Sequence, residues 1–330
     1  MGFLLRRLVF YAIALWAGVT VNFFLPRLLP GSPLEAFIAR YQNQLASNPH
    51  LLDTLKAQFP SPKDPLPVQY IHYLGNLTRL DFGVSYSQFP ERVNDIIGQA
   101  LPWTLLLAGL STVLAFGIGT LLGVVASWWR GRFLDAAVTS LTMTTAAFPP
   151  FFVAMLVLYG LGVVLGWFPL GHTNTGGISP GLNLAFIGDT LDHVAMPLLA
   201  LLLAAIGGWL LGMRSVMINT LAEDYITMAQ AKGLSARRVM FTYAARNALL
   251  PQVTSFAIVL GYSVTSLVLI EDVFSYQGLG YTMVRAVAAE DYPLMQAIFF
   301  LIVVVMLGAN LAADLLYARL DPRVRDAQGA

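Results

Sequence analysis

The sequence predicts an all-α integral membrane protein with six transmembrane helices, both termini in the cytoplasm and an extracytoplasmic cap after the first span. Of its 330 residues, 57% are hydrophobic and 11% are charged, whereas a soluble domain carries about 25% charged residues. The mean hydropathy is +0.68. Long uncharged segments recur along the chain, and a spanning helix needs about 20 mostly apolar residues.

The uncharged segments locate the candidate spans. They cover residues 8–26, 96–129, 136–188, 194–213, 247–270 and 292–313. The second is longer than one span, so its start is expected to lie along the membrane surface or to cap the span. The third is apolar only to about Trp167, and Pro149 and Pro150 predict a kink within it. Three glycine pairs are spaced as in the G-x-x-x-G motif, which favours close helix contacts. They are Gly119 and Gly123, Gly162 and Gly166, and Gly208 and Gly212.

Basic residues near the span ends predict the orientation. Twelve of the 19 Lys and Arg residues fall on one side of a six-span chain, and cytoplasmic loops carry the excess of Lys and Arg. These twelve are Arg6, Arg7, Arg130, Arg132, Arg214, Lys232, Arg237, Arg238, Arg246, Arg319, Arg323 and Arg325. Both termini are therefore expected in the cytoplasm, with the first two arginines anchoring the first span.

This topology divides the chain into four parts. They are an N-terminal anchor span (1–29), an extracytoplasmic cap (30–95), a transmembrane core (96–318) with a cytoplasmic loop at 214–246, and a cytoplasmic tail (319–330). The cap is rich in Pro, Asn and Gln and contains short helical stretches such as 51–59. The sequence does not predict how the cap folds.

Composition excludes several function classes. Cysteine is absent, which excludes disulfides, thiolate metal sites and cysteine nucleophiles. A net charge of +1 gives no basic footprint for nucleic acid. No catalytic, cofactor or metal site is predicted. The spans carry no Asp or Glu near their centres, and an autonomous secondary transporter or channel, which is the alternative function, would predict intramembrane charges or inverted repeats.

The cytoplasmic loop carries the clearest local pattern. Good helix formers run up to Lys232, and Gly233 fits a left-handed helix end with Leu234 as the hydrophobic residue after it. Ser235 can cap a second helix, and Pro251 is expected early in the fifth span, where a missing N–H is tolerated. The pattern predicts a helix, a sharp glycine turn and a second helix at the membrane face.

Tyr225, Met228 and Ala229 are spaced to share one face of the first of these helices. Such a face suits a groove in a partner protein. A plain amphipathic loop lying on the bilayer is the alternative from spacing alone.

The segment from Glu223 to Pro251 resembles the cytoplasmic coupling loop of ABC importer permeases, and most closely that of the dipeptide, oligopeptide and nickel importers. The matching residues are Glu223, Asp224, Tyr225, Ala229, Ala231, Lys232, Gly233, Leu234, Ser235, Arg246, Asn247, Ala248, Leu249, Leu250 and Pro251. The long interval from Gly233 to Pro251, and Thr227 and Met228 in place of the general Glu-Ala, argue against a sugar permease.

Other segments resemble the same family in the same order. They lie at residues 29–33, 80–86, 271–280, 291–293 and 321–323. Gln277 replaces the usual proline and Glu290 the usual arginine. The resemblance covers about residues 1–325.

The resemblance implies the type I ABC importer permease fold in the cell (inner) membrane. It implies a second homologous permease subunit, two ATPase subunits that hold ATP and Mg, and an extracytoplasmic solute-binding protein. The chain itself has no P-loop sequence and is not expected to be an enzyme. The solute stays open among dipeptides, longer peptides, metal chelates and oligosaccharides.

Three groups of site residues follow from the resemblance. The ATPase-coupling residues are Glu223, Asp224, Tyr225, Met228, Ala229, Ala231, Lys232, Gly233, Leu234, Arg237, Arg238, Asn247 and Pro251. The outer-gate or binding-protein contacts are Glu271, Phe274, Ser275, Gly278, Gly280 and Asp291, with an ordinary tight turn as the alternative. The substrate-path hydroxyls are Thr139, Thr142, Ser263 and Ser266, with helix contacts or bonds to their own backbone as the alternative.

Overall fold

The computed structural model describes residues 2–28, 65–176, 181 and 183–320, and in these the regular secondary structure is helical apart from an isolated bridge between Val84 and Arg92. Most of the expected cap, the motifs at 29–33 and 321–323, and most of the expected tail lie outside the described residues. The helices are α1 (Gly2–Phe24), η1 (Leu25–Leu28), α5 (Leu66–Thr78), α6 (Val93–Trp128), α7 (Phe133–Ala146), α8 (Pro150–Val157), η2 (Leu158–Val164), α9 (Leu184–Leu221), α10 (Asp224–Ala231), α11 (Ala236–Arg238), η3 (Val239–Ala245), α12 (Arg246–Tyr262), η4 (Thr265–Leu267), α13 (Val268–Val273), α14 (Leu279–Ala288) and α15 (Tyr292–Leu320).

Within the described residues, four helical segments are long and apolar enough to cross a membrane: Leu5–Phe24, Val93–Trp128, Leu184–Leu221 and Tyr292–Ala312. Helix α7 and the α8–η2 segment together are also long and apolar enough, but the chain bends by 101° at the break between them. They add a fifth span only when the bent pair is counted as one. The predicted third span is therefore sharply bent where Pro149 and Pro150 stand. The predicted fifth span is divided, because α12 ends at Tyr262 and the chain continues through η4 into α13.

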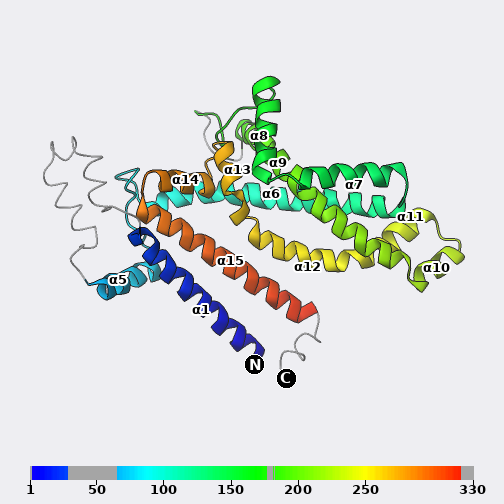
Figure 1. Ribbon diagram of the computed structural model, residues 1–330, viewed down its shortest axis with the longest axis horizontal. Helices are drawn as coiled ribbons and strands as arrows, with labels where there is room; N and C mark the ends of the chain where they lie inside the picture. The colour runs from blue at the N-terminus through cyan, green and yellow to red at the C-terminus, as the bar shows by residue number, and fades with distance from the viewer. Residues whose placement is uncertain (1, 29–64, 177–180, 182, 321–330) are drawn as a thin grey trace.

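Helices α6 and α9 form the centre of the molecule, with α7 and α12 beside them (Figure 1). Gly119 and Gly123 allow the close approach of α6 to α9. A Cβ added at Gly119 would lie 2.6 Å from the Cβ of Trp209, and one at Gly123 would lie 2.7 Å from the carbonyl oxygen of Leu210. Close contact at this G-x-x-x-G motif, predicted from its spacing, is confirmed, whereas an added Cβ at Gly166 or Gly208, which belong to the other two such pairs, would meet nothing within 4 Å.

Helices α1 and α15 lie side by side at the edge of the molecule (Figure 1). Near the N-terminal end of α1, Arg7 Nη1 donates to Asp314 Oδ2 at 2.7 Å, and the Tyr11 hydroxyl donates to the same oxygen at 2.5 Å. At the other end, Asn22 and Gln296 each donate to the backbone carbonyl of the other. The N-terminal end of α1 and the C-terminal end of α15 are therefore adjacent.

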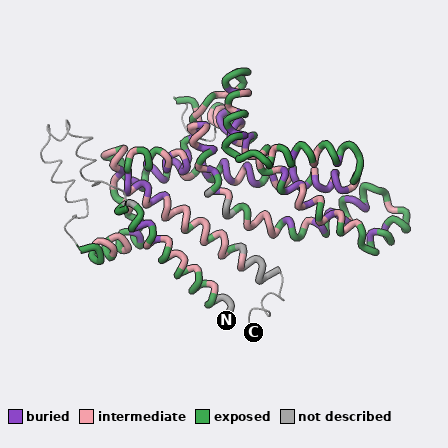
Figure 2. The backbone as a smooth tube through the Cα atoms, viewed as in Figure 1, coloured by how far each residue is buried: buried purple, intermediate pink, exposed green. Residues whose placement is uncertain are grey.

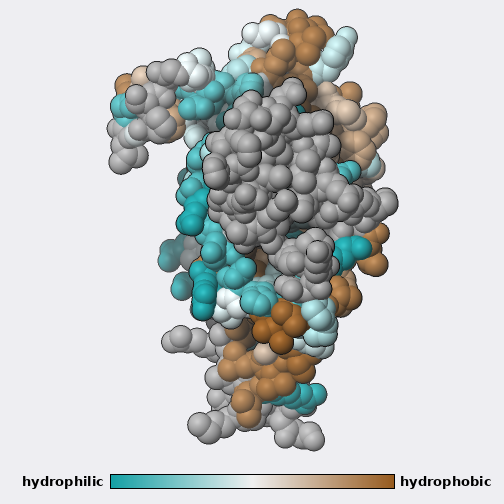
Figure 3. All heavy atoms as spheres, turned by 90° about the vertical axis from the view of Figure 1, so that its left-hand side faces the viewer, coloured by the Kyte–Doolittle hydropathy of each residue, from teal (hydrophilic) through white to brown (hydrophobic). Residues whose placement is uncertain are grey.

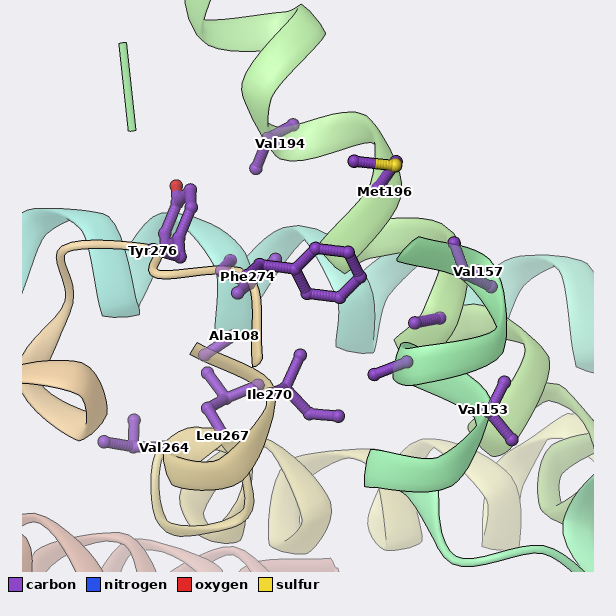
Figure 4. Close-up of a cluster of buried hydrophobic side chains, with 13 residues drawn as sticks. Ala108, Val153, Val157, Val194, Met196, Val264, Leu267, Ile270, Phe274 and Tyr276 are labelled. Atoms are coloured by element: carbon purple, nitrogen blue, oxygen red, sulfur yellow. The ribbon is translucent and has the colours of Figure 1, made fainter. Parts of the chain in front are cut away.

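Buried residues concentrate along α6 and α9 and at the ends of the bundle (Figure 2). They form three clusters, of which one joins α8 and α9 to the segment around Phe274 and Tyr276 (Figure 4). Many apolar side chains stay exposed, among them Phe10, Ile13 and Trp16 at about 60%. On the face shown in Figure 3, hydrophobic residues gather at the top and bottom of the view. Exposed apolar helix faces are what lipid chains would contact.

Candidate functional site

The connection between α9 and α12 contains the predicted glycine turn. Gly233 has a φ of +73° directly after α10. Its N–H donates to the carbonyl of Gln230 at 2.9 Å, and the N–H of Leu234 donates to the carbonyl of Ala229 at 3.4 Å. These two bonds define a Schellman motif, in which glycine is favoured because the left-handed conformation is costly for other residues. The helix–glycine–helix geometry predicted from the sequence is confirmed.

Helix α10 packs against the elements on both sides of it in the chain. Ile226 and Ala229 are buried in one cluster with Met213 and Met217 of α9 and with residues of η3. The sequence placed Ala229 on the partner-facing side with Tyr225 and Met228, and that placement is wrong. The buried face is set by Ile226, which lies three residues before Ala229 and turns it inward.

Tyr225 and Met228 remain on the open side of α10, with exposed fractions of 39% and 61%. The Tyr225 hydroxyl accepts a hydrogen bond of 2.9 Å from Asn247 Nδ2, so α10 is also tied to the start of α12. The remaining predicted coupling residues are exposed except Leu234, which is half-buried. They are Glu223, Asp224, Ala231, Lys232, Leu234, Arg237 and Arg238.

Two details after the glycine turn differ from expectation. Ser235 stands at the N-cap of α11, but its side chain makes no capping bond. Pro251 lies inside α12, because α11, η3 and α12 follow one another without a break. The second helix and the fifth span are thus one helical path, and its first turn lies well before the proline.

A side-chain pair near this loop was not predicted. Arg214 of α9 binds Asp135 of α7 through two bonds, Nε to Oδ1 at 2.7 Å and Nη2 to Oδ2 at 2.9 Å. The Asp135 carboxylate also accepts from the Gly131 N–H at 3.0 Å and from Thr139 Oγ1 at 3.3 Å. The sequence identified Arg214 only as a cytoplasmic cation, because nothing local relates residues 79 positions apart.

The segment after α13 turns sharply at the other end of the bundle. Ser275 has a φ of +46°. Its N–H donates to the Asp272 carbonyl at 3.0 Å, and the N–H of Tyr276 donates to the Glu271 carbonyl at 2.7 Å. This is again a Schellman pattern, with serine in the place usually taken by glycine. Phe274 and Tyr276 are fully buried on either side of the turn (Figure 4).

Glu271 is buried beneath the N-terminus of α14. Its carboxylate accepts from the Gly280 N–H at 2.7 Å and the Tyr281 N–H at 3.3 Å, and from Thr104 Oγ1 at 2.7 Å. Thr104 in turn accepts from the Leu279 N–H at 2.7 Å. The first free N–H groups of α14 are thereby satisfied, and the carboxyl group lies at the positive end of the helix.

Gly278 and Gly280 leave the space that this carboxylate and the α13 backbone need. A Cβ at Gly278 would collide with the Glu271 carboxylate, and a Cβ at Gly280 would lie 2.5 Å from Val268 Cα. Gln277, which stands where the related family has proline, approaches the loop before α9, where Thr173 Oγ1 donates to its Oε1 at 3.3 Å. The predicted outer element is therefore a packed junction, and its contact with another protein stays a prediction.

Asp291 connects two segments that the sequence singled out separately. It precedes α15 and is fully buried. Its carboxylate accepts from the hydroxyl of Ser85, from the N–H and hydroxyl of Ser87 at 2.9 and 2.7 Å, and from the Leu294 N–H at 3.3 Å. The 80–86 motif is thus held against the beginning of α15, which Asp291 caps.

We expect Asp291→Ala to lower the free energy of unfolding by about 2–4 kcal/mol, because it removes a helix cap and leaves buried donors without an acceptor. The midpoint of thermal unfolding in detergent measures this loss. Glu290→Gln is the matched control, since Glu290 is exposed beside it. Equal midpoints for the two variants would contradict the capping role.

Each of the four predicted substrate-path hydroxyls donates a hydrogen bond to a residue three or four positions before it in the chain. Thr139 donates to Asp135, Thr142 to the Val138 carbonyl at 2.8 Å, Ser263 to Leu260 at 2.8 Å and Ser266 to Ser263 at 2.9 Å. Thr142 is also buried against Gly207 of α9. These bonds agree with the alternative of local bonding, and a substrate path along them stays a prediction.

Comparison with known proteins gives consistent matches over the chain. The family model of the binding-protein-dependent transport system inner membrane component matches residues 119–326. A putative peptide permease protein of Brucella suis is 34% identical over 97% of this chain and 98% of its own length. The oligopeptide transport system permease protein AppB of Bacillus subtilis is 33% identical, and OppB of Escherichia coli is 30% identical, each over 98% of this chain and 99% of its own length.

Proposed function

The chain belongs to the family of binding-protein-dependent transport system inner membrane components, and from that premise we propose that it is the membrane-spanning permease subunit of an ATP-driven peptide importer. Peptides are the proposed cargo because the similar proteins are named as peptide or oligopeptide permeases. The chain would form part of the solute path together with a second, homologous permease subunit.

The proposed topology has six spans, with both termini in the cytoplasm. Arg7 and Asp314 support it, because their ion pair brings the two ends of the described chain to the same side. The bent α7–α8 segment and the divided α12–α13 segment would supply the third and fifth crossings. The protein would be a multi-pass component of the cell (inner) membrane.

The observation that carries the proposal is the arrangement of α10. This short helix packs through Ile226 and Ala229 on α9 and η3, and it leaves Tyr225 and Met228 exposed. Such a helix suits a groove in an ATPase subunit, and a push on it would reach both α9 and α12. ATP and Mg would be held by two partner ATPase subunits, so that hydrolysis takes place outside this chain.

On the opposite side, the junction around Glu271 and Gly278 and the cap at Asp291 would face an extracytoplasmic binding protein. The Glu271 and Asp291 carboxylates are buried and hydrogen-bonded within the chain. They would therefore act by holding the outer ends of α14 and α15 in place for that protein, while exposed neighbours make the contact.

The test is purification of the tagged chain from native membranes in mild detergent, followed by reconstitution into proteoliposomes with a peptide-loaded binding protein. We expect a second permease and ATPase subunits to co-purify, and uptake of labelled peptide to require ATP. A stable lone chain that transports solute without ATPase partners would overturn the proposal in favour of an autonomous transporter.

A pair of variants tests the α10 contact in the same preparation. Met228→Asp places a charge on the exposed apolar face and is expected to reduce ATPase co-purification. Thr227→Asp places the same charge on the neighbouring exposed position of α10 and is the control. Equal ATPase recovery in both variants would contradict this face as the contact.

A further inference from the structure

The Asp135–Arg214 pair is built to hold two helices in one geometry. The planar guanidinium and the carboxylate meet through two short bonds, and such bidentate pairs are both strong and directional. The Asp135 side chain is only 7% exposed. Its two further donors, Gly131 and Thr139, fix the carboxylate on the α7 side. The pair is therefore a rigid joint between the beginning of α7 and the last third of α9.

A second contact fixes the register of the same two helices. A Cβ at Gly207 of α9 would lie 2.8 Å from the carbonyl oxygen of Thr142 in α7, so the backbones touch there. Asp135 and Thr142 are seven residues apart on α7, and Gly207 and Arg214 are seven residues apart on α9. The two contacts therefore lie two turns apart along an antiparallel helix pair.

Arg214 lies beside the residues on which α10 rests. Met213 precedes it and Met217 follows one turn later, and both are buried in one cluster with Ile226 and Ala229 of α10. A displacement of α10 therefore acts on α9 at the level where α7 is attached. Gly123 of α6 approaches the same turn, since a Cβ there would lie 2.8 Å from the Cβ of Met213.

At its far end, α7 leads to the outer junction. The chain bends by 101° into α8. There Val153, Ala154 and Val157 are buried together with Phe274 and Tyr276 (Figure 4). A continuous chain of packed elements thus runs from α10 through α9 and α7 to α8 and the turn that follows α13.

We propose that Asp135 and Arg214 are positioning residues that carry the movement of α10 into α7, and through α8 to the outer junction. The inference rests on the proposed function, because it assigns the pair a role in coupling α10 to the rest of the permease. Without the pair, α7 keeps its contact at Gly207 but loses the joint nearest to α10. ATP hydrolysis then continues, but less solute is transported for each ATP hydrolysed.

The test compares Asp135→Asn and Arg214→Lys with the wild-type chain in the reconstituted complex. The first removes the charge of the carboxylate, and the second keeps the positive charge but loses the bidentate fork. Peptide uptake and ATP hydrolysis are measured in the same vesicles, with uptake per ATP as the readout. Asp314→Asn is the control, because it removes the charge from another Arg–Asp pair between two helices, Arg7–Asp314 of α1 and α15.

We expect uptake per ATP to fall about tenfold in Asp135→Asn and Arg214→Lys, a change within the usual range of coupling between sites. The ratio should stay at the wild-type value in Asp314→Asn. Variants that assemble with a lower unfolding midpoint but keep the wild-type ratio would overturn the proposal, since the pair would then serve stability alone. A wild-type chain that recruits no ATPase would instead refute the proposed function, and the two failures are thereby distinguished.

A distance measurement gives a second readout that is independent of uptake. The sequence has no cysteine, so spin labels can be placed at Leu141→Cys on α7 and Val304→Cys on α15, both exposed positions. We expect the distance between the labels to change on ATP binding in the otherwise wild-type complex and to change less after Asp135→Asn. Equal changes in both would overturn the proposal.

Discussion

Gly233→Val is expected to leave the chain inserted in the membrane but to reduce ATP-driven peptide uptake about tenfold or more. Gly233 adopts a φ of +73°, and a Cβ added there would meet nothing within 4 Å. The cost of valine therefore comes from its backbone alone, at about 1–3 kcal/mol for a residue held in this region. The strain opens the bonds from Gly233 and Leu234 to α10, and α10 loses its fixed direction.

Uptake and ATP hydrolysis in proteoliposomes check this result. Gly166→Val is the matched control, since Gly166 also has a positive φ, at +62°, and open space around it, but lies after η2. Gly233→Asn should show a smaller loss, because asparagine tolerates the left-handed conformation better than a β-branched residue. Wild-type uptake in Gly233→Val would refute the coupling role of the turn.

Glu271→Ala is expected to have the largest effect on stability. It removes the acceptor of the Gly280 and Tyr281 N–H groups and of the Thr104 hydroxyl in a buried region. Each buried donor left without an acceptor costs about 1–3 kcal/mol. We expect the free energy of unfolding to fall by about 3 kcal/mol or more, with a matching loss of monodisperse protein in detergent.

Thermal unfolding and size-exclusion profiles measure this loss. Asp272→Ala is the control, since Asp272 is adjacent in sequence and gives its backbone carbonyl to the turn at Ser275, which the substitution keeps. Glu271→Gln should be intermediate, because the amide keeps one acceptor oxygen but presents N–H groups to other donors. If Glu271→Ala and Asp272→Ala unfold at the same temperature, Glu271 does not cap α14.

Local patterns allowed the sequence to predict the parts of the site that depend on near neighbours. The turn at Gly233 follows from a left-handed glycine and the hydrophobic Leu234 after it, and all its bonds lie within six residues. The close approach at Gly119 and Gly123 uses small residues one helical turn apart, but Gly166 and Gly208 have the same spacing within their pairs and no close neighbour. The turn at Gly233 therefore has its physical cause in the segment itself, whereas a glycine pair also needs a second helix that faces it.

Contacts between distant segments could not be predicted in the same way. Asp135 and Arg214 pair across 79 positions, and Thr104 and Glu271 across 167. Ala229 was predicted to face a partner protein but is buried. Spacing identifies the residues that share a helix face, but it does not say which face the rest of the protein covers. The break after Tyr262 was not predicted, because uncharged residues continue across it. A hydropathy pattern reports whether residues are apolar and does not report where a helix ends.

The length of α9 has a mechanical consequence. Its 38 residues measure about 57 Å at 1.5 Å per residue, whereas the hydrocarbon layer is about 30 Å thick. Pro197 lies inside this helix, and an interior proline breaks the run of backbone bonds, so the segment after it is the part that turns as one rod. That segment is about 36 Å long, and a tilt of about 5° about its centre moves its two ends by about 1–2 Å in opposite directions. Since α6 and α7 touch this segment through glycines, we expect them to follow the same rotation, so that a movement that narrows the bundle on one side of the membrane would widen it on the other.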